Sequence, residues 1–132
     1  SSMLRVPREL PALMRAQKVQ HKAAKVGFDW DDVSGAVDKL YEEINELKTA
    51  VSDNVKSEIE DEFGDVLFSC VNIARFLDVD SEEALTGATD KFVSRFSTVE
   101  QLARERGIDM NSAGIEELDK LWDEAKKIKK AE

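Results

Sequence analysis

Apolar side chains recur along the chain at steps of three and four residues, the period of an α-helix with one buried face. The two clearest stretches lie at 33–51 and 59–77. The first carries Val37, Leu40, Tyr41, Ile44, Leu47 and Val51, and the second carries Ile59, Phe63, Val66, Leu67, Cys70, Ile73, Ala74 and Leu77. Strand-like alternation of apolar and polar residues is missing from the pattern. The sequence therefore predicts an all-α fold.

Helix-starting and helix-ending residues divide this pattern into about five helices. The expected boundaries are Pro11 and Gly27 for the first helix, Asp53 or Asn54 as the cap of the third, Asp80 or Ser81 as the cap of the fourth, Gly107 as its end, and Ser112 ahead of the last. The segment 27–32, with sequence GFDWDD, is expected to be an ordered loop because it combines two aromatic residues with three acids.

The length of 132 residues is typical of a single domain. We expect residues 11–130 to form that domain and residues 1–10 to be a tail. Ser1 and Ser2, ahead of Met3, resemble residues added in cloning. No internal repeat or linker divides the pattern.

The composition excludes several classes of function. A formal net charge of -9 opposes binding to DNA or RNA. One cysteine, Cys70, and one histidine, His21, exclude an internal disulfide, a multi-cysteine zinc site and paired-histidine metal motifs. No apolar run is long enough to span a membrane. We expect a cytoplasmic protein with no membrane contact. Cys70 lies on the apolar face of the third helix and is expected to pack in the core.

Acidic residues are concentrated on the second and third helices. Glu43 and Glu46 share one helical sector, and Glu58, Glu62 and Asp65 form a row beside the apolar stripe of the next helix. If the two helices pair antiparallel, the rows can face each other and offer the clustered oxygen ligands that Mg²⁺ prefers. The alternative is a solvated acidic face. A metal site explains better why like charges crowd beside apolar stripes.

The order of these residues resembles a known family. Glu42-Glu43-Ile44-Asn45-Glu46 followed by Glu62-Phe63-Gly64-Asp65 is similar to the EExxE and ExxD signature of the all-α nucleoside triphosphate (NTP) pyrophosphatases, and most similar to the C-terminal domain of MazG proteins. The resemblance extends over about 11–129 and includes the segments 26–30, 66–75 and 91–96. EExxE alone is weak in a glutamate-rich chain, but the ordered set is specific.

The resemblance implies a dimeric helical fold and the hydrolysis of an NTP to a nucleoside monophosphate and pyrophosphate, a reaction that cleans the nucleotide pool. It implies Mg²⁺ as the cofactor, with Mn²⁺ as a substitute, held by Glu43, Glu46, Glu62 and Asp65. Glu42 and Asp61 would support these ligands, and one neighbouring acid would take a proton from the attacking water. MazG proteins often carry two such domains, so this chain resembles either one excised domain or a single-domain relative.

Five further residues are candidates for binding the substrate. Lys91 and Arg95 stand at i and i+4, where they could hold the β- and γ-phosphates. Trp122 could stack on a base and Lys126 could reach a phosphate, and Lys39, one turn before Glu43, is another phosphate candidate. The alternatives are solvated charges for Lys91 and Arg95, a core position for Trp122, and a salt bridge for Lys39. Phe28 and Trp30 would either close the nucleotide pocket or anchor their loop.

Two other functions compete with this interpretation. The same fold could act on dUTP, dCTP or a damaged nucleotide, since base choice depends on pocket shape. The chain could instead be a non-enzymatic helical module whose acidic face binds a basic partner. A homodimer is also expected from the residues themselves, because Tyr41, Phe68 and Phe76 bring the apolar area to more than one small bundle readily hides.

Overall fold

The computed structural model describes residues 3–131 and confirms the all-α prediction: these residues form six helices and no strand. The helices are α1 (Ala12–Lys25), α2 (Val33–Asp53), α3 (Lys56–Phe76), α4 (Ser81–Glu105), α5 (Met110–Ala113) and α6 (Ile115–Ala131). The helix beyond the expected five is the four-residue α5, which begins where the Asp109 side chain accepts a hydrogen bond from the Asn111 amide. None of the helices in the described residues is long and apolar enough to cross a membrane.

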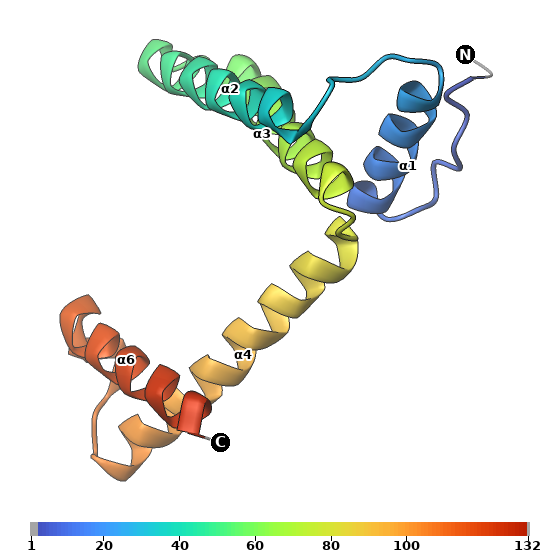
Figure 1. Cartoon of the computed structure of the whole chain (residues 1–132). Helices are drawn as coiled ribbons and strands as arrows, with labels where there is room; N and C mark the ends of the chain where they lie inside the picture. Colours follow the sequence, from blue (N-terminus) through green and yellow to red (C-terminus); the bar gives the residue numbers. More distant parts are fainter. Residues whose placement is uncertain (1–2, 132) are drawn as a thin grey trace. The chain divides into compact units, whose positions relative to one another are not determined.

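The chain divides into two compact units, one ending at Ala84 and the other beginning at Leu85. In the first unit α2 and α3 form an antiparallel pair, and α1 packs against α3 (Figure 1). The connection between α2 and α3 is short because Asn54 takes a left-handed conformation, with φ of 57° and ψ of 40°. Asparagine tolerates this conformation better than most residues, so it can close the helix pair in a tight turn.

Asn54 also corrects one expectation from the sequence. Asp53 or Asn54 was expected to cap the third helix, but Asp53 is the last residue of α2 and Asn54 is its C-terminal cap. Val55 stands at the start of α3 and makes no side-chain capping bond. At the next boundary the expectation holds, because the Asp80 side chain accepts a hydrogen bond from the Glu83 amide at 3.0 Å.

The loop 26–32 between α1 and α2 is ordered, as expected, and polar contacts hold it. Asp29 forms a bidentate ion pair with Arg75 of α3, with N–O distances of 2.7 and 2.8 Å. Asp32 caps α2 by accepting a hydrogen bond from the Ser34 amide at 2.8 Å. The aromatic residues of the loop are not buried, since Phe28 is 79% exposed.

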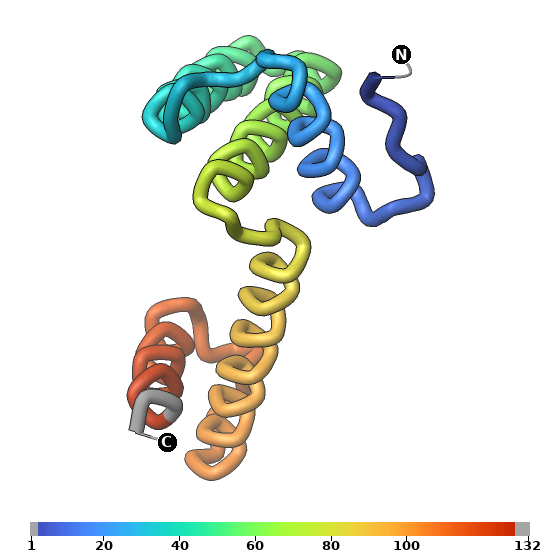
Figure 2. Tube along the Cα trace, turned by 45° about the vertical axis from the view of Figure 1, so that its right-hand side comes forward, coloured from blue at the N-terminus to red at the C-terminus, as the bar shows by residue number. Residues whose placement is uncertain are grey.

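The second unit has its own apolar core, in which the end of α4 packs beside α6 (Figure 2). Its buried residues are Val99, Ala103, Leu121 and Ala125, and partly buried side chains, including Trp122, pack around them. In the first unit, much of the expected apolar stripe of α3 is uncovered. Phe63 and Leu67 are about half exposed, and Cys70 is exposed rather than packed as the pattern predicted. Within the first unit, the stripe exceeds what α1 and α2 cover.

Candidate metal and nucleotide site

Three of the predicted carboxylates meet between α2 and α3. Glu43 of α2 and Glu62 and Asp65 of α3 each offer an oxygen, and these atoms all lie within 4.8 Å of one another. Glu62 and Asp65 are three residues apart and therefore share a helical face. The turn at Asn54 brings that face against Glu43. The antiparallel pairing expected from the sequence is thus present.

Burial leaves part of this oxygen cluster without partners. Glu43 is only 5% exposed, and its Oε2 atom is buried without a hydrogen-bond partner. The Oε2 atom of Glu62 is also buried and unpartnered. A buried carboxylate oxygen that accepts no hydrogen bond is unfavourable. Two such oxygens in one cluster fit the coordination of a cation.

The raised pKa values of Glu62 and Asp65 show that gathering these negative charges is unfavourable. Desolvation, a hydrogen bond with Glu46 and the charges of its acidic neighbours raise the pKa of Glu62 from 4.5 to about 7. Desolvation, followed by the charges of Glu43 and Asp61, also raises the pKa of Asp65. A bound divalent cation would reverse both effects by favouring the ionised carboxylates.

The remaining predicted acids lie around this centre. Glu46, the fourth predicted ligand, is outside the group of converging oxygens, but it is near enough to raise the pKa of Glu62, and both residues line a groove that also contains Glu58. Asp61 is near enough for its charge to act on Asp65, and Glu42 acts in the same way on Lys39. The structure therefore brings three of the four predicted metal ligands together near the middle of the α2–α3 pair, with Glu46, Glu42 and Asp61 on the same two helix segments.

Lys39 lies directly beside the acids. Its ammonium group is 3.0 Å from the Glu43 carboxylate, and this hydrogen bond raises the pKa of Lys39. The side chain also lines a cavity of about 500 Å³ formed with α1, the 26–32 loop and α3. Lys39 thus makes the salt bridge that was its alternative role, and it is also in contact with this cavity.

The other four predicted substrate residues belong to the second unit. Lys91 is exposed, Arg95 is half-buried and Lys126 is exposed, and none of them has an ion pair within the described part of the chain. Trp122 packs on the Phe92 ring at a centroid distance of 5.1 Å and adjoins the unit's core. One face of the indole is therefore covered by protein. A role for these four residues in binding a substrate stays a prediction.

The cavity beside Lys39 contains residues that the sequence analysis did not select. Gln20 of α1 and Asn72 and Arg75 of α3 line it, together with Phe28 and Trp30. Gln20 is 5% exposed although it is polar. A signal was present in the sequence, because Gln20 falls on the periodic face of the first helix, where an apolar residue is expected.

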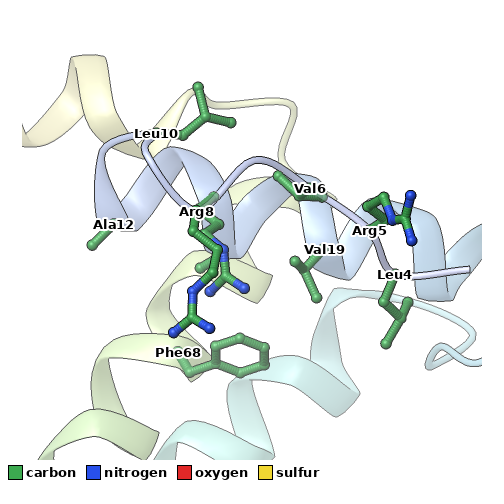
Figure 3. Close-up of a pocket in the computed structure, with 10 residues that line it drawn as sticks. Leu4, Arg5, Val6, Arg8, Leu10, Ala12, Val19 and Phe68 are labelled. Carbon is green, nitrogen blue, oxygen red and sulfur yellow. The ribbon is translucent and has the colours of Figure 1, made fainter. Parts of the chain in front are cut away.

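A second cavity of about 810 Å³ lies beyond Phe68, beneath the N-terminal segment. Figure 3 shows Leu4, Val6 and Arg8 of that segment with Val19 of α1 and Phe68 of α3 around it. Arg15 also lines this cavity, and its Nε atom is buried without a partner. The two cavities share Leu4, Val19 and Phe68. The first cavity is the one that includes Lys39.

Comparison with known proteins identifies a family that matches the chain. Residues 31–100 match the model of the MazG nucleotide pyrophosphohydrolase domain. The chain is 45% identical over 126 residues to a nucleoside triphosphate pyrophosphohydrolase of Escherichia coli K12, covering 92% of this chain and 47% of that protein. It is 48% identical over 117 residues to the nucleoside triphosphate pyrophosphohydrolase/pyrophosphatase MazG of Thermotoga maritima, covering 89% and 45%. The chain thus spans less than half the length of these relatives.

A third relative is the uncharacterized protein YabN of Bacillus subtilis, which is 48% identical over 126 residues. The match covers 95% of this chain but only 26% of YabN. All six predicted acids and the Lys39, Lys91 and Arg95 positions lie inside the 31–100 match, whereas Trp122 and Lys126 lie beyond it.

Proposed function

The chain belongs to the MazG nucleotide pyrophosphohydrolase domain family, and from this premise we propose that it hydrolyses NTPs to nucleoside monophosphate and pyrophosphate with Mg²⁺ as cofactor. The observation that carries the proposal is the convergence of the Glu43, Glu62 and Asp65 oxygens within 4.8 Å. The names of the Escherichia coli and Thermotoga maritima relatives support the same reaction.

The acids fit the proposed cofactor. The donor set consists entirely of carboxylate oxygens, which suit Mg²⁺ or Mn²⁺, and two of these oxygens are buried without partners. Glu43, Glu46, Glu62 and Asp65 would hold the ion. Bound there, Mg²⁺ supplies positive charge that offsets the negative charge of the triphosphate and of the leaving pyrophosphate.

The chain's own groups complete the site in this proposal. Glu42 and Asp61 stand beside the ligands, and one neighbouring carboxylate takes the proton of the water that attacks the α-phosphorus. Lys39 is placed to contact a phosphate oxygen because its ammonium group lies next to Glu43. Lys91, Arg95 and Lys126 would hold the outer phosphates. Trp122 would contact the nucleotide through the indole face that Phe92 leaves free.

We also propose that the enzyme is a homodimer. Tyr41 is 64% exposed on α2, and Phe63, Leu67 and Phe68 of α3 are each at least 44% exposed. Large apolar side chains gathered on paired helices are typical of a surface that a second subunit covers. Phe76, which was also expected to add to this surface, is half-buried beneath the Arg75 guanidinium.

Product analysis tests the reaction. The protein is incubated with a panel of NTPs and dNTPs and Mg²⁺, and the products are separated by anion-exchange chromatography. We expect nucleoside monophosphate and pyrophosphate in equal amounts. Glu43→Gln should remove activity, whereas Glu60→Gln, an exposed glutamate outside the cluster, should retain it. A nucleoside diphosphate as the first product would contradict the proposed cleavage between the α- and β-phosphates.

A further inference from the structure

The cavity beside Lys39 has the size and walls of a binding site for a flat aromatic ring. Its volume of about 500 Å³ is in the range of small-ligand sites. Phe28 and Trp30 line it from the 26–32 loop, and Phe68 lines it from α3. Aromatic side chains around a cavity favour an aromatic ligand through stacking.

Gln20 is the most buried polar residue among those that line this cavity. Its Nε2 atom donates a hydrogen bond to the Phe68 carbonyl oxygen at 2.9 Å, which fixes the orientation of the amide. The other end of the amide, Oε1, is buried and has no partner. The side chain as a whole is 95% buried, since only 5% of the residue is exposed. An acceptor left unpaired at such a depth is unfavourable, and a hydrogen-bond donor that reached it would relieve this cost.

The walls of the cavity are held in place without a ligand. Arg75 binds Asp29 of the loop and also donates to the Asn72 side-chain oxygen at 2.9 Å. Trp30 lies directly over Gly35, where a β-carbon would come within 2.5 Å of the indole. A preorganised cavity loses less entropy when it binds a ligand.

The cavity and the acids are neighbours. Lys39 lines the cavity, and the same ammonium group lies 3.0 Å from Glu43. A nucleotide whose phosphates lie at the carboxylates can therefore place its base among the aromatic residues.

We propose that this cavity binds the nucleobase and that Gln20 Oε1 accepts a hydrogen bond from an exocyclic amino group of that base, an inference that rests on the proposed nucleotide substrate. An amino group projects from the ring and can reach a recessed acceptor. The N3–H of uracil or thymine lies between two carbonyl oxygens, which the Gln20 oxygen repels. The enzyme should therefore prefer bases that carry an amino group.

Binding tests the proposal independently of catalysis. Adenosine and purine riboside, which lacks the amino group, are titrated into the protein while the two indole N–H signals are followed by NMR. We expect the Trp30 signal to shift and adenosine to bind about tenfold more tightly, the worth of one net hydrogen bond. In Gln20→Met this preference should disappear, whereas Gln101→Met, the same change on an exposed surface, should keep it.

A kinetic measurement tests the same preference for an amino group during hydrolysis. ATP should exceed purine riboside triphosphate about tenfold in kcat/KM for the wild type, and the two should be equal for Gln20→Met. Equal binding of the two nucleosides to the wild type, or shifts at Trp122 without shifts at Trp30, would overturn the inference. Failure of the proposed function is a separate result: no triphosphate would yield pyrophosphate, whatever the binding titrations show.

Discussion

Removing one of the clustered acids should stabilise the metal-free protein and weaken its response to magnesium. Glu62→Gln is the sharpest change, because it preserves the shape of the side chain and removes the carboxyl whose pKa is raised to about 7. The raised pKa means that folded protein keeps a proton on Glu62 at pH values where the unfolded chain, with a pKa near 4.5, has lost it.

The size of the effect follows from these two pKa values. Near pH 5.75, midway between them, the folded state holds about 0.9 proton more at Glu62 than the unfolded state does. The resulting contribution to stability is complete below pH 4.5, falls as the pH rises, and is gone above about pH 7. Asp65, whose pKa is also raised, contributes with the same sign.

The assay is thermal unfolding in a chelator between pH 4.5 and 8.5. The Tm of the wild type should fall more steeply with pH than that of Glu62→Gln, and at pH 8 the variant should be at least as stable. Magnesium should reverse this ranking, because a ligand that binds only the folded state at 100 times its Kd adds about 2.7 kcal/mol to the stability of the wild type. Glu60→Gln should behave like the wild type throughout.

Two results would refute this reasoning. Parallel pH profiles of wild type and Glu62→Gln in chelator would mean that the carboxylates do not repel one another in the folded state. An equal gain in Tm from magnesium in both proteins, or no gain in either, would mean that the acids form only a solvated surface. The Asp29–Arg75 pair also depends on pH, but it is common to all three proteins and cancels in their differences.

Three further predictions concern the residues around this centre. Lys91→Ala and Arg95→Ala should each raise the KM for the triphosphate about tenfold, the effect of one lost charged contact, and leave Mg²⁺ binding by calorimetry unchanged; an equal loss of Mg²⁺ affinity would show a structural role instead. Asp29→Asn should reduce the free energy of unfolding by about 1–3 kcal/mol at pH 7, measured in urea. The hydrogen bond from Arg75 lowers the pKa of Asp29 below 3.8, so this loss of stability should shrink as the pH falls through the lowered pKa. A loss of stability that does not depend on pH would argue against the ion pair. Light scattering at micromolar concentration should give the mass of two chains for the wild type and a smaller mass for Tyr41→Glu; a single-chain mass for the wild type would exclude the proposed dimer.

The helices were predictable from the sequence because their apolar periods are long and regular. The start of α4 at Asp80 was predictable for a local reason, since an acidic side chain next to free amides is a sufficient signal. At the start of α3 the same signal misled, because Asn54 can adopt the left-handed conformation that ends the preceding helix. Asparagine can cap the start of a helix or end the preceding one, and only its backbone conformation tells the two roles apart.

Within the site, the acids were predictable and the cavity was not. Glu43, Glu62 and Asp65 lie on the adjoining faces of two helices that follow each other, so helical spacing was enough to bring them together. The cavity combines α1, a loop and α3, and its shape depends on the Asp29–Arg75 pair, which joins residues far apart in the sequence. Helical period carries no information about such a contact. The exposure of Cys70 was missed for a related reason, because a periodic apolar stripe does not reveal which part of it a neighbour covers.

The left-handed turn at Asn54 also fixes the separation of the two halves of the acidic signature along the chain. Glu43 and Asp65 each lie eleven positions from Asn54, so the turn is at the midpoint of the sequence between them, and the two residues lie at the same height along the paired helices. One residue inserted between Asn54 and Glu62 would turn the whole α3 face by about 100° and move its acids away from Glu43. A whole turn added on one side alone would restore the face but move its acids by about 5.4 Å along the helix axis. Chains that share this hairpin should therefore tolerate added helical turns only in matched pairs, one on each side of the Asn54 turn.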